Sequence, residues 1–294
     1  MPSYPFRTVD VFTTRRFGGN PLAVLPDARG ISDHDMQQLA AEFNLSETTF
    51  VLPPDNPENT ARVRIFNRTH EMPFAGHPMV GTAYVLAEAA DEFVATLRFE
   101  VPAGVVTVRL DRKDGTLHGA TIDAPRSLSL GPQIERDWIA ACVGLTSADV
   151  LISSHLPTEA SVGNTYVIAE VTKAALHKAA PEAAAFHKLL EAHPALNGRF
   201  SLYLYARADS EIHARMFAPL AGTSEDPATG SAATPLAALL LSISGRDNDA
   251  FLIHQGADMG RPSLLYTSAY RTSNGIHASV GGSCVPVLRG TVSL

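Results

Sequence analysis

The segment His77-Pro-Met-Val-Gly-Thr-Ala83 occurs a second time, slightly altered, as Asp226-Pro-Ala-Thr-Gly-Ser-Ala232. Both copies fit the pattern [His/Asp]-Pro-x-x-Gly-[Ser/Thr]-Ala, and they are 226 − 77 = 149 residues apart, about half of the 294-residue chain. Each copy follows a strand-like segment of similar pattern, Arg64-Ile-Phe66 in the first case and Arg215-Met-Phe217 in the second. Similarity at so long a period predicts two copies of one structural unit.

Each copy predicts the start of a buried helix. His77 or Asp226 stands where an N-cap residue belongs, and proline at the first helical position loses no hydrogen bond. Small residues then allow another group to approach the first turn, and the free N–H groups there attract an anion such as a carboxylate. If the two units are related by a pseudo-twofold axis, both helix starts face one cleft. The difference between His77 and Asp226 suits directional proton chemistry, although two structural N-caps without chemistry are an equal alternative.

The rest of the pattern is that of a mixed α+β protein with a lobe at 1–124 and a second lobe at 125–294. A return of the last C-terminal residues to the first lobe is an open alternative. A helix that begins after Ser32 and ends at Asn44 has apolar residues at helical spacing. A helical region at 173–193 is interrupted near Pro181. The expected linker, which contains two prolines, is 123–132. Strand-like segments rich in Val, Ile, Thr and Phe occur at 6–12, 22–25, 49–52, 62–66, 95–99, 105–110, 166–171, 201–206 and 212–217.

Composition excludes several classes of protein. The formal net charge is −7, and no run of Lys and Arg offers a basic face to nucleic acid. The two cysteines, Cys142 and Cys284, are far apart, which is typical of a reducing cytosol and gives no disulfide or metal motif. The first residues read as a strand rather than a signal peptide, and no apolar stretch is long enough to span a bilayer. We therefore expect a cytoplasmic protein with no nucleic-acid or membrane partner.

Three residues are candidates for acid–base chemistry. Glu47 lies where the first helix gives way to a strand, and a carboxylate between apolar walls there would have its pKa raised toward that of a general acid–base. His77 can donate or relay a proton, and Asp226 can orient an amine or hydroxyl of a substrate. Nucleotide, zinc and serine-hydrolase motifs are absent from the sequence. Cys142 is expected in the core rather than as a nucleophile.

Five ordered motifs together resemble the PhzF-like family of phenazine-biosynthesis isomerases. They are Phe17-Gly-Gly-Asn-Pro-Leu-Ala-Val24, Leu45-Ser-Glu-Thr-Thr-Phe50, Met72-Pro-Phe-Ala-Gly-His-Pro78, Glu225-Asp-Pro-Ala-Thr-Gly-Ser-Ala232 and Gln255-Gly-Ala-Asp-Met-Gly-Arg-Pro262. The resemblance runs from end to end. It implies a diaminopimelate-epimerase-like fold, with two pseudo-symmetric lobes that each wrap a curved, mostly antiparallel sheet or barrel around a central helix, and an active site in the groove between them.

The resemblance also implies the roles of individual residues. Glu47 takes the place of the family's acid–base glutamate, His77 that of its histidine, and Asp226 and Ser231 those of the aspartate and serine near the second helix. The backbone N–H groups of Gly76 and Gly230 would bind substrate, and Asn20 and Ser46, which lie within two of the motifs, are expected to bind it as well. The resemblance implies no cofactor or metal, and it implies a homodimer. Diaminopimelate epimerases carry a cysteine pair at the two helix starts, which this sequence lacks.

These observations favour a cofactor-independent isomerase that moves a proton between carbons of a small carboxylic acid, similar to trans-2,3-dihydro-3-hydroxyanthranilate isomerase. Two alternatives stay open. A racemase, epimerase or dehydratase of an amino or hydroxy acid would use the same anion site and an acidic C–H. A carboxylate-binding protein without catalysis would keep the helix starts but would not need Glu47.

Overall fold

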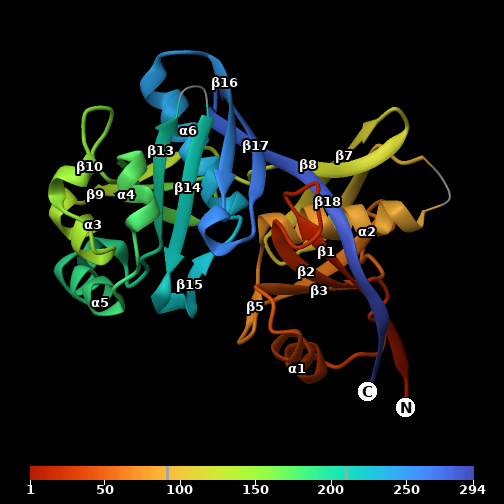
Figure 1. Ribbon diagram of the computed structural model, residues 1–294. Helices are drawn as coiled ribbons and strands as arrows, with labels where there is room; N and C mark the ends of the chain where they lie inside the picture. The colour runs from red at the N-terminus through yellow and green to blue at the C-terminus, as the bar shows by residue number, and fades with distance from the viewer. Residues whose placement is uncertain (91–92, 209–210) are drawn as a thin grey trace. The chain divides into compact units, whose positions relative to one another are not determined.

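The chain divides into two compact units in the computed structural model, which describes residues 1–90, 93–208 and 211–294 (Figure 1). The first unit comprises residues 1–123 and 280–294, and the second comprises residues 124–279. The two ends of the chain lie side by side in the first unit, where Ser3 pairs with Ser293. The final strand thus completes the sheet that the first strand begins.

The first unit is a strand ring around one helix. Strand β1 pairs with β2 and β18, β2 runs parallel to β3, β3 pairs with β4, and β4 runs parallel to β6. Strand β6 pairs with β7, β7 with β8, and β8 with β18, which closes the ring. The bounds are β1 (Ser3–Val11), β2 (Asn20–Leu25), α1 (Asp33–Phe43), β3 (Glu47–Leu52), β4 (Ala61–Phe66), β5 (Glu71–Met72), α2 (Gly76–Ala89), β6 (Thr96–Val101), β7 (Gly104–Lys113), β8 (Thr116–Asp123) and β18 (Gly275–Ser293).

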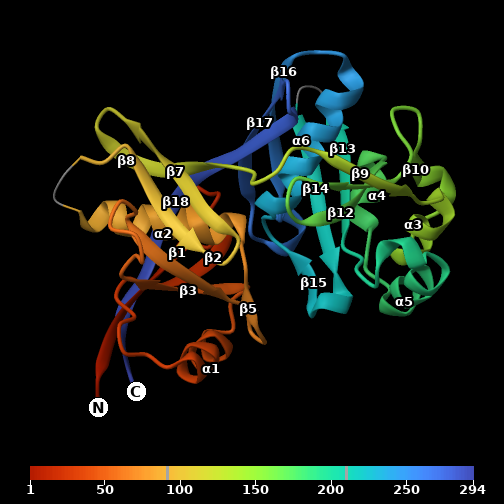
Figure 2. The same ribbon diagram turned by 180° about the vertical axis from the view of Figure 1, so that it is seen from behind.

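Helix α2 lies inside this ring, as Figure 2 shows from behind. Its residues from Gly76 to Val85 are all buried, and it contacts β1, β2, β3, β7 and β8. A helix that is apolar on every side cannot rest against a flat sheet, because one face would stay in water. The closed sheet therefore follows from the sequence of α2.

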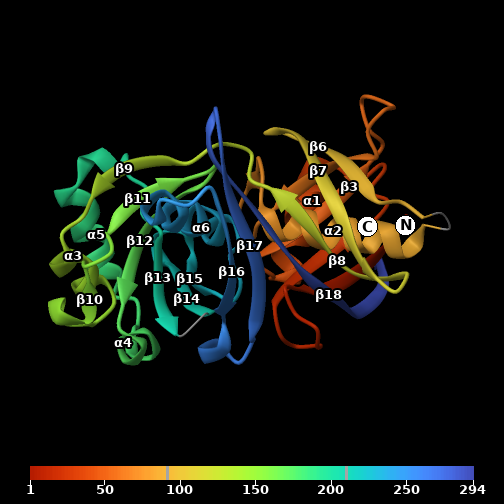
Figure 3. The ribbon, with the colours of Figure 1, turned by 90° about the horizontal axis from the view of Figure 1, so that it is seen from above.

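The second unit repeats the design around α6. Its bounds are β9 (Ser129–Gln133), α3 (Arg136–Cys142), β10 (Val150–Leu151), β11 (Thr158–Ser161), β12 (Thr165–Val171), α4 (Lys173–Lys178), α5 (Ala183–Ala192), β13 (Leu202–Ala208), β14 (Glu211–Ala218), β15 (Thr223–Asp226), α6 (Gly230–Ser244), β16 (Asn248–Gln255) and β17 (Ser263–Thr272). Short 3₁₀ turns cover Ser147–Asp149, Pro194–Leu196, Pro219–Ala221 and Ala257–Met259. Figure 3 shows α6 surrounded by the strands of its unit, and it contacts β11, β12, β16 and β17.

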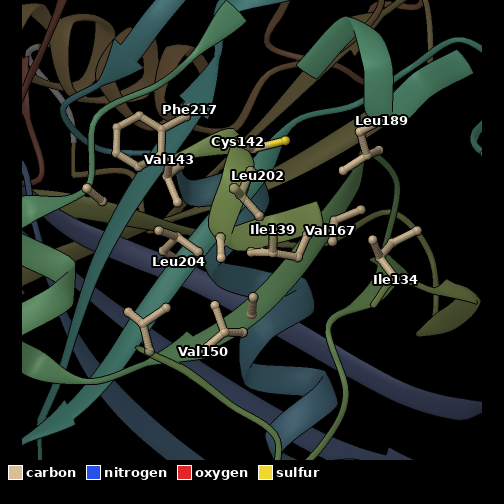
Figure 4. Packing of buried hydrophobic residues seen from close by; sticks show 14 of the residues in the cluster. Ile134, Ile139, Cys142, Val143, Val150, Val167, Leu189, Leu202, Leu204 and Phe217 are labelled. Atoms are coloured by element: carbon tan, nitrogen blue, oxygen red, sulfur yellow. The ribbon is translucent and has the colours of Figure 1, made fainter. Parts of the chain in front are cut away.

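A second apolar core joins α3, α4 and α5 to one face of β12 and β13 (Figure 4). Ile139 and Cys142 of α3, Leu189 of α5 and Leu204 of β13 are each fully buried in it. Burial raises the pKa of the Cys142 thiol to about 12. Cys142 is a core residue, as its place in the sequence predicted.

Both units follow the same order of elements. In the first, β2 and β3 are parallel and joined through α1, and β4 and β6 are parallel and joined through α2. In the second, β12 and β13 are parallel and joined through α4 and α5, and β14 and β16 are parallel and joined through α6. The fold is therefore the predicted α+β architecture of two similar lobes, each with a central helix.

An ion pair also recurs at matching positions. Arg64 binds both carboxylate oxygens of Glu71, with Nε–Oε1 2.7 Å and Nη2–Oε2 2.6 Å. Arg215 binds Glu225 in the same way, with both distances at 2.8 Å. Each guanidinium also lies over the ring two residues later in its strand, at 5.1 Å from Phe66 and 4.9 Å from Phe217. The duplicated strand segments are thus real structural counterparts.

The two copies of the repeat nevertheless align in a different register from the one that the sequence motif indicated. Helix α2 begins at Gly76, one residue before His77, whereas α6 begins at Gly230, four residues after Asp226. The helix starts are therefore 230 − 76 = 154 residues apart, and the register pairs His77 with Ser231. The predicted N-caps are wrong as well, because Ala75 and Thr229 occupy those positions. Small residues are common in any tightly enclosed helix, so the Gly-[Ser/Thr]-Ala similarity misaligned the two copies.

Other local predictions are confirmed. Ser32 caps α1 by accepting the N–H of Asp35, and Asn44 ends it in the left-handed conformation at φ 53°. The helical region at 173–193 is two helices, with a break that contains Pro181. The expected linker at 123–132 also contains most of strand β9.

Because α6 is enclosed, truncations at two positions within one of its turns should lower the free energy of unfolding by very different amounts. Replacing the fully buried Leu241 with Ala should lower the free energy of unfolding by about 2–5 kcal/mol, because it opens a cavity in a filled core. The same truncation at Ile243, whose side chain is 46% exposed, should cost below about 1 kcal/mol. Urea unfolding of both variants measures the difference, and equal losses would contradict the enclosed position of α6.

Candidate active site

The first unit brings Glu47 and His77 together. Glu47 is the first residue of β3, where the chain leaves the left-handed turn at Asn44, and His77 is the second residue of α2. The Nε2 atom of His77 lies 3.3 Å from Oε2 of Glu47. Only 15% of the Glu47 side chain and 7% of the His77 side chain are exposed. A carboxyl group and an imidazole therefore meet where the central helix begins.

Burial determines the charge of His77. Loss of hydration lowers its pKa to about 3, so the imidazole is neutral near pH 7. The contact with Glu47 is therefore not an ion pair. A neutral imidazole carries one N–H and one acceptor nitrogen, so it can either donate to a carboxylate or accept from a carboxylic acid.

Asn20 and Ser46 lie in the same unit as Glu47. Asn20 is the fully buried first residue of β2, the strand that runs parallel to β3, and Ser46 directly precedes β3. The turn before Asn20 requires glycine at Gly19, which has φ +62° and where a Cβ would come within 2.2 Å of the Val11 carbonyl oxygen. The Phe17-Gly-Gly-Asn motif is thus a tight turn that fixes the start of β2.

The second unit places Gly230 and Ser231 in the first turn of α6. N–H groups in the first turn have no acceptor within their own helix, so they suit an anionic oxygen. The Oγ of Ser231 lies 2.7 Å from the hydroxyl of Tyr166, on β12. Gly76 has the equivalent position in α2.

Asp226, the last residue of β15, belongs to a buried chain of polar side chains. The Thr229 hydroxyl donates to Oδ2 of Asp226 at 2.5 Å. Gln255 donates from Nε2 to the Thr229 hydroxyl at 3.0 Å and to the Asp226 carbonyl at 2.8 Å. Its Oε1 accepts the Thr229 N–H and the Tyr203 hydroxyl, each at 3.1 Å. The carboxylate is therefore held through Thr229, which is itself held by Gln255, and the side-chain amide of Gln255 makes four hydrogen bonds.

The predicted residues thus fall into two groups. The first unit holds Asn20, Ser46, Glu47, Gly76 and His77, and the second holds Asp226, Gly230 and Ser231. Sequence reasoning missed Tyr166, Tyr203, Thr229 and Gln255 as partners of these groups. Thr229 and Gln255 both lie within the sequence motifs described above, and this position was a signal of their importance. Neither side chain titrates, so neither is a candidate for acid–base chemistry.

Metal ligands do not gather in the part of the chain that the structure describes, where no group of three or more His, Cys, Asp or Glu side chains could hold an ion. Over the same residues, no helix is long and apolar enough to cross a bilayer. The remaining cysteine, Cys284, is buried as a free thiol, and burial raises its pKa well above the usual range.

Comparison with known proteins adds to this geometry. Residues 9–290 match the model of a family described as phenazine biosynthesis-like protein. The chain belongs to this family. An uncharacterized isomerase of Mesorhizobium japonicum is 38% identical, with 99% of each chain covered. The trans-2,3-dihydro-3-hydroxyanthranilate isomerase of Pseudomonas chlororaphis is 35% identical, with 97% of this chain and 98% of the relative covered.

The fold of this phenazine biosynthesis-like protein is shared with solved structures. The crystal structure of a PhzF-family protein of Bacillus anthracis superposes with a TM-score of 0.88 over 100% of both chains, at 23% sequence identity. Relatives over the whole chain are named as isomerases, and this chain is an enzyme of that class.

The buried neutral His77 predicts a pH-dependent stability. Its folded pKa of about 3 lies below the ordinary value of 6.5, so between these values the unfolded chain binds more protons than the native one. Stability should therefore fall as pH drops below 6.5, by at most about 1.4 kcal/mol per unit. In His77→Asn, denaturant unfolding across pH 3.5–6.5 should show a flatter dependence. An unchanged slope would contradict burial of a neutral imidazole.

Proposed function

We propose that this chain is a cofactor-independent isomerase of the trans-2,3-dihydro-3-hydroxyanthranilate type. The observation that carries the proposal is the approach of Glu47 to neutral His77 at the start of a buried helix, at 3.3 Å. Support comes from the Pseudomonas chlororaphis relative of that name, which is 35% identical along almost the full length of both chains. The substrate is then a small cyclic carboxylic acid with an acidic C–H and an amine or hydroxyl.

The proposed reaction moves one proton and needs no co-reactant. The Glu47 carboxylate removes a proton from a ring carbon, the electron pair delocalises along the conjugated system, and the same carboxyl group returns the proton to another carbon. Atoms and oxidation state balance, since substrate and product are isomers. His77, whose Nε2 lies 3.3 Å from Oε2 of Glu47, is near enough to form a hydrogen bond with that carboxyl group when it carries the proton.

Binding roles are proposed for the remaining residues. The N–H groups of Gly76 and Gly230 and the hydroxyl of Ser231 bind anionic oxygen, because first-turn N–H groups and the helix dipole favour negative charge. Asp226 accepts from the substrate amine or hydroxyl, and Asn20 and Ser46 bind substrate beside Glu47.

Turnover in D₂O tests the proposal. Followed by NMR, wild-type protein should convert trans-2,3-dihydro-3-hydroxyanthranilate to its isomer, with deuterium at the new carbon in every turnover in which the Glu47 carboxyl proton exchanges with solvent before it is returned. Glu47→Gln should reduce the rate about 10²- to 10⁴-fold, the usual cost of losing a general acid–base. Glu42→Gln is the matched control, because Glu42 is an exposed carboxylate of the same unit.

Three results would contradict parts of this proposal. Deuterium at the original carbon, without a new isomer, would show a racemase or epimerase. Full activity in Glu47→Gln would remove Glu47 from the mechanism. Binding of the compound without exchange would identify a carboxylate-binding protein.

We also propose that the enzyme is cytoplasmic and that it is a homodimer, and the homodimer is what the resemblance to its family implies. Both cysteines are buried free thiols, the form that a reducing compartment maintains. Light scattering during size-exclusion chromatography should give twice the mass of the chain, and a value equal to one chain would contradict the dimer.

A further inference from the structure

The buried chain of Asp226, Thr229 and Gln255 occurs in only one copy of the repeat. Strand pairing places Asp226 opposite Met216, just as Met72 is opposite Ile65 in the first unit. Thr229 and Ala75 are both N-caps of the central helices. The parallel pairs β14–β16 and β4–β6 can be aligned so that Arg215 corresponds to Arg64. In this alignment Gln255 has the position that Val101 has in the first unit. Three apolar residues thus stand in one unit where three polar residues stand in the other.

This contrast shows that the fold can form without the polar network. Both units have the same helix enclosed by the same order of strands, yet the first builds it with Met72, Ala75 and Val101. A buried polar group that loses its partner costs about 1–3 kcal/mol, so such a network is a risk to stability rather than a necessity. Its presence at Asp226 alone therefore indicates a task that the fold does not set.

The hydrogen bonds also fix the direction of every proton in the chain. Gln255 uses both of its N–H groups and both acceptor positions of Oε1 on four partners, which determines the orientation of its amide. Because Thr229 Oγ1 accepts from Gln255, its own proton must point to Oδ2 of Asp226. Oδ2 is consequently held as a hydrogen-bond acceptor, and the carboxylate cannot rotate without breaking the chain.

We propose that Thr229 and Gln255 are positioning residues, which hold the Asp226 carboxylate and the adjoining start of α6 for recognition of an amine or hydroxyl donor on the substrate. This rests on the proposed function and extends it, because it assigns a reason for the polar network and a chemical group that it selects. A carboxylate held as an acceptor prefers a ligand that presents N–H or O–H over one of similar shape that presents none.

A set of threonine variants tests the proposal. Thr229→Val removes the hydroxyl and keeps the shape, and Thr229→Ser restores the hydroxyl. Thr267→Val is the matched control, since Thr267 is 3% exposed, Thr229 is 6% exposed, and the Thr267 hydroxyl donates to the Phe251 carbonyl rather than to a side chain of the network. We expect the melting temperatures of the two valine variants to fall by similar amounts. Only Thr229→Val should lose kcat/KM, by about 10- to 100-fold with most of the change in KM, and Thr229→Ser should recover it.

Ligand binding separates this proposal from the proposed function. Calorimetry with 3-hydroxyanthranilate, which has donor groups, and with benzoate, which has none beside its carboxylate, needs no turnover. Wild-type protein should prefer 3-hydroxyanthranilate, and Thr229→Val should lose most of that preference. If wild type fails to isomerise the dihydro compound but shows this preference, only the proposed function is overturned. An equal preference in wild type and Thr229→Val, or equal losses of kcat/KM in Thr229→Val and Thr267→Val, would overturn the positioning role.

Discussion

Burial of the two central helices on every side, along all but their last turns, is the constraint on which the rest of the structure depends. A helix without a polar face has to be covered on all sides, and a sheet that closes on itself does this. The free N–H groups of the first turn then become the natural place for an anion. In the first unit Glu47 and His77 meet at this end of α2, so the packing that makes the fold also locates its reactive groups.

Comparison of the two units shows which features of their common architecture are retained and which differ. The Arg64–Glu71 and Arg215–Glu225 pairs are retained with nearly the same geometry, which indicates that they support the turn before each central helix. The same register matches Glu47 with Ser201, because Thr48 faces Phe66 and Leu202 faces Phe217. One unit therefore carries a carboxylate at this position and the other a hydroxyl, so only the first unit offers a carboxylate base there.

The sequence predicted the fold class, the capping of α1 and the place of Cys142, because each depends on local pattern or on apolar spacing. It placed the repeat in the wrong register, because the Gly-[Ser/Thr]-Ala similarity reflects helix packing rather than equivalent positions. The contact of His77 with Glu47 was not available from spacing, since thirty residues and several elements separate them. Gln255 was overlooked because an amide does not titrate, and its role emerges only from four bonds made in three dimensions.

The neutrality of His77 has a consequence for the proton transfer proposed for Glu47. A protonated imidazole beside the carboxylate would hold it ionised and weaken it as a base, whereas a neutral ring does not. With Glu47 ionised, the N–H of a neutral imidazole can donate to it, and with Glu47 protonated, the acceptor nitrogen of the other tautomer can receive from it. The Glu47–His77 contact at 3.3 Å can therefore persist in both states of the carboxyl group. Burial of the histidine thus removes the charge that would otherwise fix the proton in one place.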